Sequence, residues 1–140
     1  MDLQQLADRL EIQEVFARYA RGVDTHDRAL LRSVFTDDAV MDYSSVGGPV
    51  GSADEVCDWI STGISYLPWT QHIVTNFEIT LDGDEATAIV MFHNPMMLPG
   101  MDTPSACGGY YHHRLVRTAE GWKSRHIVEE NRWFVNRPGG

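Results

Sequence analysis

The sequence predicts an α+β domain in which N-terminal helices cover one face of a curved antiparallel sheet. In the first half of the chain, apolar residues recur every three or four positions, which is the period of a helix buried on one side. From about residue 70 onward the period becomes two, and turn residues separate four segments rich in β-branched and aromatic residues. We expect a single domain over residues 1–140, with a cavity between helices and sheet.

The first half of the chain is expected to hold three helices. The first spans roughly six turns and weakens at Gly22, and its apolar stripe consists of Leu3, Leu6, Leu10, Ile12, Val15, Phe16 and Tyr19. Asp27 can cap a second, short helix, whose apolar positions are Leu30, Leu31, Val34 and Phe35. Residues 39–44 are typical of a short strand and residues 47–51 of a turn. Ser52 and Asp54 can cap the third helix, whose apolar positions are Val56, Trp59, Ile60 and Ile64.

The second half is expected to form four long strands, at residues 71–81, 85–98, 107–118 and 122–135. The short turns at residues 82–84 and 119–121 make antiparallel neighbours of the strands that they join. Pro95, Pro99 and Pro104 indicate a long connection or a strand end, since proline cannot donate a hydrogen bond within a sheet.

Composition excludes several classes of partner. With 20 acidic residues against 11 Lys and Arg, the chain has a net charge of −9, which argues against nucleic-acid binding. Cys57 and Cys107 form neither a CxxC pair nor a His-rich metal motif, so free thiols in a reducing compartment are expected. The sequence contains neither a signal-peptide pattern nor an apolar stretch long enough for a membrane span. We expect a soluble, cytoplasmic protein.

Asp24 and His72 are the most informative pair of residues. Asp24 ends the first helical pattern, and His72 begins the first strongly β-like segment. If the fold brings them together, the carboxylate can fix the tautomer of the imidazole and make it a better base. Taken singly, Asp24 is more typical of a turn or capping residue, and His72 is more typical of a hydrogen-bonded histidine in the core or at a sheet edge.

Five short motifs occur in an order that resembles one protein family. They are Tyr19…Asp24…Asp27, Phe35-Thr36-Asp37-Asp38-Ala39-Val40 with Asp42-Tyr43-Ser44, Thr70-Gln71-His72…Asn76, Gly108-Gly109-Tyr110-Tyr111 and Gly121-Trp122. Together they resemble the SnoaL-like branch of the nuclear-transport-factor-2-like superfamily. That branch includes polyketide cyclases, scytalone dehydratase, bile-acid dehydratase and hexachlorocyclohexane dehydrochlorinase. The resemblance implies a cone-shaped α+β barrel.

The resemblance also implies roles for individual residues. Asp24 and His72 match the acid–histidine dyad with which such dehydratases and dehydrochlorinases abstract a proton, and Tyr19 and Tyr43 match tyrosines that face the same pocket. Relatives often place an arginine further along the last strand than Arg125 lies here, so Arg125 takes that role only if the strand is bulged.

Six residues are candidates for contacts with a substrate: Asn76, Tyr110, His112, Arg125, Trp59 and Met91. Because neighbouring strand residues face opposite sides of a sheet, only one of His112 and His113 can point into a cavity, which argues against a metal site formed by the pair. His112 reaches the cavity if the face that it shares with Tyr110 lines the cavity; otherwise both side chains pack or lie at a subunit contact. Met91 belongs to a methionine-rich region that suits either an apolar ligand wall or ordinary core packing.

These residues predict an acid/base enzyme that needs neither cofactor nor metal, most simply a dehydratase-like lyase for a polycyclic, polyketide-like or steroid-like molecule. An isomerase or a cyclase with the same dyad is the first alternative, and a non-catalytic domain that binds a small ligand or dimerises is the second. Large apolar residues on both faces of the expected strands predict a homo-oligomer formed through the outer face, since helices cover only one face. The resemblance implies a homodimer or a homotrimer.

Overall fold

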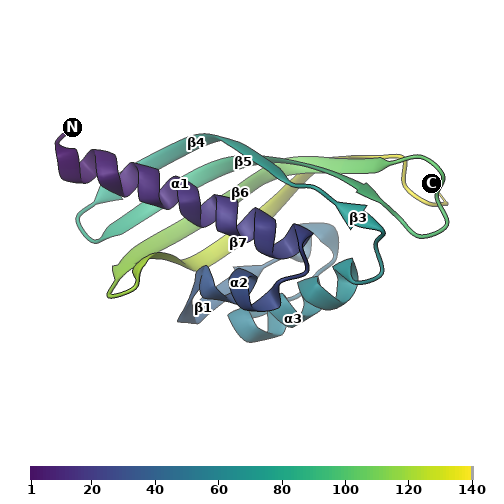
Figure 1. Cartoon of the computed structure of the whole chain (residues 1–140), viewed down its shortest axis with the longest axis horizontal. Coiled ribbons are helices and arrows are strands. Elements are labelled where there is room, and N and C mark those ends of the chain that lie inside the picture. The colour runs from purple at the N-terminus through teal and green to yellow at the C-terminus, as the bar shows by residue number, and fades with distance from the viewer. Residues whose placement is uncertain (140) are drawn as a thin grey trace.

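The computed structural model describes residues 1–139 and begins with α1 (Leu3–Asp24), the long helix that lies over the sheet (Figure 1). Its 22 residues confirm the expected length. Asp2 and Gln5 form a capping box, in which each side chain accepts a hydrogen bond from the backbone N–H of the other. The first apolar positions of the expected stripe, Leu3, Leu6 and Leu10, are exposed, because the first turns of α1 bury the side that carries Asp8.

Two further helices follow the predicted pattern. Asp27 caps α2 (Arg28–Ser33) by accepting a hydrogen bond from Leu30 N, and Ser52 caps α3 (Ala53–Ile64) by accepting one from Glu55 N. Gly22 allows α1 and α2 to approach closely, because a side-chain carbon at position 22 would lie 2.7 Å from Leu31 N. A short 3₁₀ helix, η1 (Ser44–Val46), separates the first two strands.

The sheet is strongly curved, and its concave face receives the helices (Figure 1). Its strands are β1 (Phe35–Asp42), β2 (Val50–Ser52), β3 (Trp69–Thr70), β4 (Ile73–Asp82), β5 (Glu85–Met97), β6 (Ser105–Thr118) and β7 (Gly121–Val135). The order is β2-β1-β7-β6-β5-β3, with β4 also paired to β5. The four long strands are antiparallel neighbours, as predicted. The expectation of a purely antiparallel sheet was wrong in one place, because β1 pairs with β7 in parallel.

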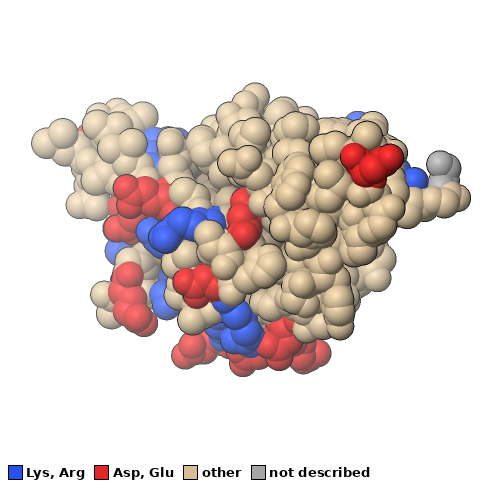
Figure 2. All heavy atoms as spheres, turned by 45° about the vertical axis from the view of Figure 1, so that its right-hand side comes forward, with Lys and Arg blue, Asp and Glu red and all other residues tan. Residues whose placement is uncertain are grey.

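The core fills the space between α1 and the concave face of the sheet. Its largest fully buried side chains include Ile12, Phe16, Leu115, Trp122 and Ile127. No helix in the described part of the chain is both long and apolar enough to cross a membrane. Figure 2 shows one face of the surface, on which acidic and basic side chains lie next to one another in its lower part while much of the remainder is uncharged.

A buried ionic cluster fixes α1 to the sheet. Both carboxylate oxygens of Asp8 lie 2.8 Å from Arg117, and Trp122 Nε1 donates to Asp8 across 3.1 Å. The Arg117 guanidinium holds the pKa of the Asp8 carboxyl well below its usual value, although burial opposes this. Because the folded state lowers this pKa, the cluster stabilises the fold at neutral pH and loses its contribution as acid protonates Asp8.

We expect Asp8→Ala to lower the free energy of unfolding on the order of 1–3 kcal/mol, because the buried Trp122 N–H loses its acceptor. Urea unfolding at pH 7 measures the change. Asp84→Ala is the matched control, since Asp84 binds the same arginine from the exposed side and should have little effect. Equal stabilities of the two variants would show that the cluster does not fix α1.

Candidate functional site

Asp24 is the last residue of α1, and it meets His72, which lies in the short break between β3 and β4 along the edge of the sheet. Asp24 Oδ1 lies 2.7 Å from His72 Nδ1, and Asp24 Oδ2 accepts a hydrogen bond from His72 N, also across 2.7 Å. Thr70 Oγ1 donates to Asp24 Oδ1 across 2.7 Å. Three donors therefore hold the carboxylate. With the Nδ1 proton directed at Asp24, the other ring nitrogen, Nε2, is left as a proton acceptor.

The pKa of Asp24 supports this assignment of the proton. Burial alone would raise the pKa of this carboxyl, but the hydrogen bonds from His72 and Thr70 outweigh burial and lower it. The side chains are largely buried, with 7% of His72 and 17% of Asp24 exposed. Asp24 is therefore an anion at neutral pH, and the proton between the two residues stays on the imidazole.

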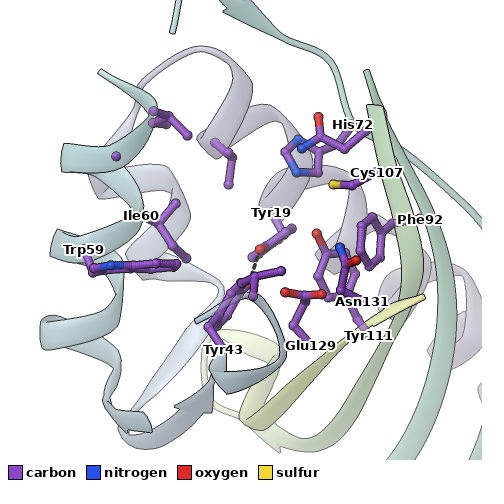
Figure 3. Close-up of a pocket in the computed structure, with 15 residues that line it drawn as sticks. Tyr19, Tyr43, Trp59, Ile60, His72, Phe92, Cys107, Tyr111, Glu129 and Asn131 are labelled. Carbon is purple, nitrogen blue, oxygen red and sulfur yellow. Dashed lines mark hydrogen bonds between the residues drawn. The ribbon is translucent and has the colours of Figure 1, made fainter. Parts of the chain in front are cut away.

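The His72 ring forms part of the wall of a cavity of about 230 Å³ between α1, α3 and the sheet (Figure 3). Most of the surface of the wall is apolar, because the tyrosine rings add to the apolar side chains of Val23, Val46, Trp59, Ile60, Ile64 and Phe92. The polar or ionisable side chains in the wall are Tyr19, Tyr43, His72, Asn94, Cys107, Tyr111, Glu129 and Asn131. Such a cavity suits an apolar ligand that carries a few polar groups.

Tyr19 and Tyr43 lie side by side in the cavity, and their hydroxyl groups share a hydrogen bond (Figure 3). Tyr111 packs edge-on against Tyr19, with ring centroids 5.1 Å apart. Burial raises the pKa of all three tyrosines. Their hydroxyl groups are therefore neutral hydrogen-bond donors at physiological pH.

The cavity also contains polar residues that the sequence analysis missed. Glu129 is 4% exposed, and Ser45 Oγ lies 3.2 Å from its Oε1. Burial raises the pKa of the Glu129 carboxyl to about 7; the hydrogen bond from Ser45 offsets part of this effect, and the charge of Asp42 adds to it. A usable signal existed, because Ile127, Glu129 and Asn131 alternate along β7 and share the inward face.

Cys107 lies in the same wall, and both cysteines are free thiols, as expected from the sequence. Burial raises the pKa of Cys57 and of Cys107 to about 11, so both thiols are protonated and unreactive at neutral pH. Within residues 1–139, no group of three or more His, Cys, Asp or Glu side chains is arranged to hold a metal ion.

The predicted site residues fall into two groups. Tyr19, Tyr43, Trp59 and His72 line the cavity, and Asp24 lies behind the His72 ring. Asn76, Met91, Tyr110, His112 and Arg125 do not line it. This placement differs from the substrate contacts that the sequence suggested for these five residues.

Each of the five has a local reason for its position. Tyr111 and His113 face inward, so the alternate residues Tyr110 and His112 face outward. Tyr110 pairs there with Met91, and His112 pairs with Ile89. His112 Nε2 lies 2.8 Å from Glu130 Oε1 on that outer side. Asn76 occupies a bulge of β4 with a φ of 53°, a conformation that asparagine tolerates.

Arg125 is itself the extra residue of a bulge in β7, and such a bulge is what the role suggested by the resemblance required. The bulge nevertheless directs the guanidinium to the surface, where Nη1 lies 3.5 Å from Glu85 Oε1. Arg125 lines a separate hollow that also contains Asp38 and Arg114.

Comparison with known proteins agrees with this architecture. Residues 4–128 match the SnoaL-like domain model. An uncharacterized protein of Mycobacterium tuberculosis is 34% identical over 130 residues, which cover 92% of this chain and 88% of that protein. A candidate scytalone dehydratase from Novosphingobium aromaticivorans has a TM-score of 0.86 at 15% identity and covers 95% of this chain and 89% of its own.

A hexachlorocyclohexane dehydrochlorinase from Novosphingobium barchaimii has a TM-score of 0.82 at 21% identity, with 100% of this chain and 97% of that chain covered. At these identities the two solved structures show a shared fold. The fold is that of the nuclear-transport-factor-2-like superfamily, as the motifs predicted. The match over residues 4–128 shows the family itself, and this chain belongs to the SnoaL-like domain family.

Proposed function

We propose that this protein is an acid/base lyase of the dehydratase type that acts on an apolar, oxygenated cyclic molecule without a cofactor. The observation that carries the proposal is the hydrogen bond between Asp24 and His72 Nδ1, together with the position of the His72 ring in the cavity wall. His72 Nε2 removes a proton from a carbon next to a carbonyl or a leaving group. The family membership and the dehydratase and dehydrochlorinase structural neighbours support lyase or isomerase chemistry in general.

The size of the cavity favours a small substrate. Its volume of about 230 Å³ is below the roughly 300–1,000 Å³ that is typical of sites for drug-sized ligands. A molecule with one or a few small rings therefore suits the site better than one of steroid size. The apolar wall would bury its ring carbons, and the tyrosine hydroxyls would hold its oxygen.

A screen of hydroxylated and ketonic cyclic compounds tests the proposal. Wild type and His72→Ala are incubated with each compound, and the products are analysed by mass spectrometry and NMR. Loss of water with wild type alone supports a dehydratase, whereas a moved double bond or a closed ring at constant mass supports an isomerase or a cyclase with the same dyad. Equal product formation by both proteins would refute a role for His72.

The two tyrosines give a second test on any substrate that the screen identifies. In the hydrogen-bonded pair one hydroxyl donates to the other, and we propose that the second hydroxyl proton is donated to a substrate oxygen. Replacing the substrate-facing donor by Phe should lower kcat by about 10²–10³-fold, because the developing charge loses its hydrogen bond. Tyr19→Phe and Tyr43→Phe are compared with Tyr66→Phe, which makes the same change at an exposed position. Wild-type rates for both cavity variants would mean that these tyrosines only pack.

Association of copies of this chain stays a prediction. Its basis is the outer face of the sheet, where Ile73, Ile89 and Trp133 are 52%, 37% and 40% exposed. We propose that this face forms the homo-oligomer contact that the sequence predicts.

A further inference from the structure

The sheet wall of the cavity contains buried polar groups that the proton abstraction by His72 does not use. Within the described part of the chain, Asn94 Oδ1 and Asn131 Nδ2 are buried without an oxygen or nitrogen hydrogen-bond partner, and the only polar neighbour that both amides share is the weakly bonding thiol of Cys107. Leaving such a group unsatisfied costs on the order of 1–3 kcal/mol, so native proteins seldom tolerate it without a reason. One acceptor and one donor in the wall of a single cavity are the pair that a hydroxyl group satisfies, because a hydroxyl both donates and accepts.

Strand register places a carboxyl group on the same face of the sheet as these two amides, one inward-facing row from Asn131 and two from Asn94. Glu129 pairs across the sheet with Tyr111 and Asn131 pairs with Gly109, while Asn94 pairs with Cys107. Tyr111, Gly109 and Cys107 are alternate residues of β6, so the three polar side chains lie on the same inward face, in three successive rows of paired residues. Figure 3 shows Glu129 and Asn131 on the sheet side of the cavity, with His72 toward one end of the view and Glu129 toward the other. The base and the carboxyl group thus line the same cavity at different places in its wall.

The surroundings of Glu129 favour a protonated carboxyl group. Tyr19 from α1, Tyr43 after β1, and Tyr111 and Cys107 from β6 are the titratable groups that face it, and burial keeps all four neutral at physiological pH. Asp42 contributes a negative charge, which also disfavours an anion at Glu129. With its pKa raised by burial to about 7, a large share of Glu129 holds a proton at neutral pH.

Building on the proposed acid/base function, we propose that Glu129 is the proton donor of the same site and that Asn94 and Asn131 hold the departing hydroxyl group beside it. As His72 Nε2 takes the proton from carbon, the electrons of the carbon–hydrogen bond form the new carbon–carbon double bond. The carbon–oxygen bond breaks with its electron pair on oxygen, which takes the Glu129 proton and leaves as water. His72 ends as imidazolium and Glu129 as carboxylate, and transfer of one proton through solvent restores both.

The choice of leaving group separates this role from a structural one. Chloride leaves as a stable anion and needs no proton, whereas hydroxide does need one. On the hydroxylated substrate from the screen, Glu129→Gln should lower kcat by about 10²-fold or more, and on the chloro analogue of that substrate it should leave kcat nearly unchanged. Asn131→Leu should raise KM for the hydroxylated compound by about tenfold and affect the chloro analogue little. Glu130→Gln, the same change on the outer face, is the matched control.

The pH profile gives a further readout. An acid must be protonated to work, so wild-type kcat/KM on the hydroxylated substrate, which reports groups of the free enzyme, should fall as pH rises through about 7, and Glu129→Gln should lack this fall. Equal losses on both leaving groups, or no loss on either, would overturn the proposal. Full activity of His72→Ala would instead overturn the proposed function, so the two failures are distinguishable.

A titration of the free protein tests the proposal without any substrate. Carboxyl ¹³C NMR of wild-type protein labelled at glutamate, with Glu130→Gln and Glu129→Gln used for assignment, follows each side chain over the pH range. A Glu129 signal that titrates near pH 7 supports a proton donor. A midpoint near the ordinary glutamate value of about 4.3 would overturn it, because the carboxyl group would then have no proton to give at neutral pH.

Discussion

His72→Ala should lower the turnover of a verified substrate by about 10²–10⁴-fold, which is the contribution typical of a positioned general base. The hydrogen bond from Nδ1 to Asp24 leaves Nε2 as the proton acceptor in the cavity wall, so the substitution removes the base while the tyrosines and the apolar wall stay in place. Single-turnover rates at saturating substrate measure the chemical step separately from binding.

A loss of activity has this meaning only if the fold survives. His72→Gln is the companion variant, because it keeps a side chain of similar reach but no general base. His93→Gln makes the same change at an exposed position on the outer face of the sheet and should retain the wild-type rate. If His72→Gln and His93→Gln were equally active, the dyad would have no role in the chemistry.

Gly109→Ala should destabilise the protein by about 3 kcal/mol or more, at or above the upper end for overpacking. An added methyl group would overlap the carbonyl oxygen of Glu130, which belongs to the neighbouring strand backbone and cannot move as a side chain can. The bulge at Arg132 brings the two strands together here, and the strand that would have to move is the one that positions Glu129 and Asn131. We therefore expect loss of both stability and activity.

Thermal unfolding followed by circular dichroism measures this effect, with an expected fall in melting temperature of roughly 10 °C. Gly63→Ala is the control, because nothing lies within 4 Å of an added carbon at this helical position. It should leave stability unchanged or raise it by up to about 1 kcal/mol, as alanine is the better helix former. Similar melting temperatures for the two variants would show that β6 and β7 can separate at little cost.

The sequence predicted what periodicity and local chemistry determine. Helix caps at Asp27 and Ser52 were identified because short polar side chains satisfy free backbone N–H groups there. The four long strands followed from alternation and turn residues. The parallel pairing of β1 with β7 could not be read in this way, because the strands are far apart in the chain and no local signal specifies which edges meet.

Which strand residues face the cavity was the harder question. Tyr110 and Tyr111 are adjacent aromatic residues, so alternation alone could not say which of them points inward. The bulges at Arg125 and Arg132 then shift the alternation within β7 itself. Alternation groups Glu129 with Ile127 and Glu130 with Val128, but both Ile127 and Val128 are apolar, so the sequence does not say which pair faces inward. In the structure Glu129 is buried in the cavity, and Glu130 lies on the outer face beside His112.

The interruption between β3 and β4 bears on the energetics of the proposed proton transfer at His72. At this break the His72 amide donates to Asp24, and Thr70 donates to the same carboxylate. Two of the three donors to Asp24 therefore come from groups whose charge does not change when the imidazole gains or loses a proton. The carboxylate stays solvated by fixed dipoles in both protonation states of the ring, and little reorganisation energy is required at this end of the site from one cycle to the next.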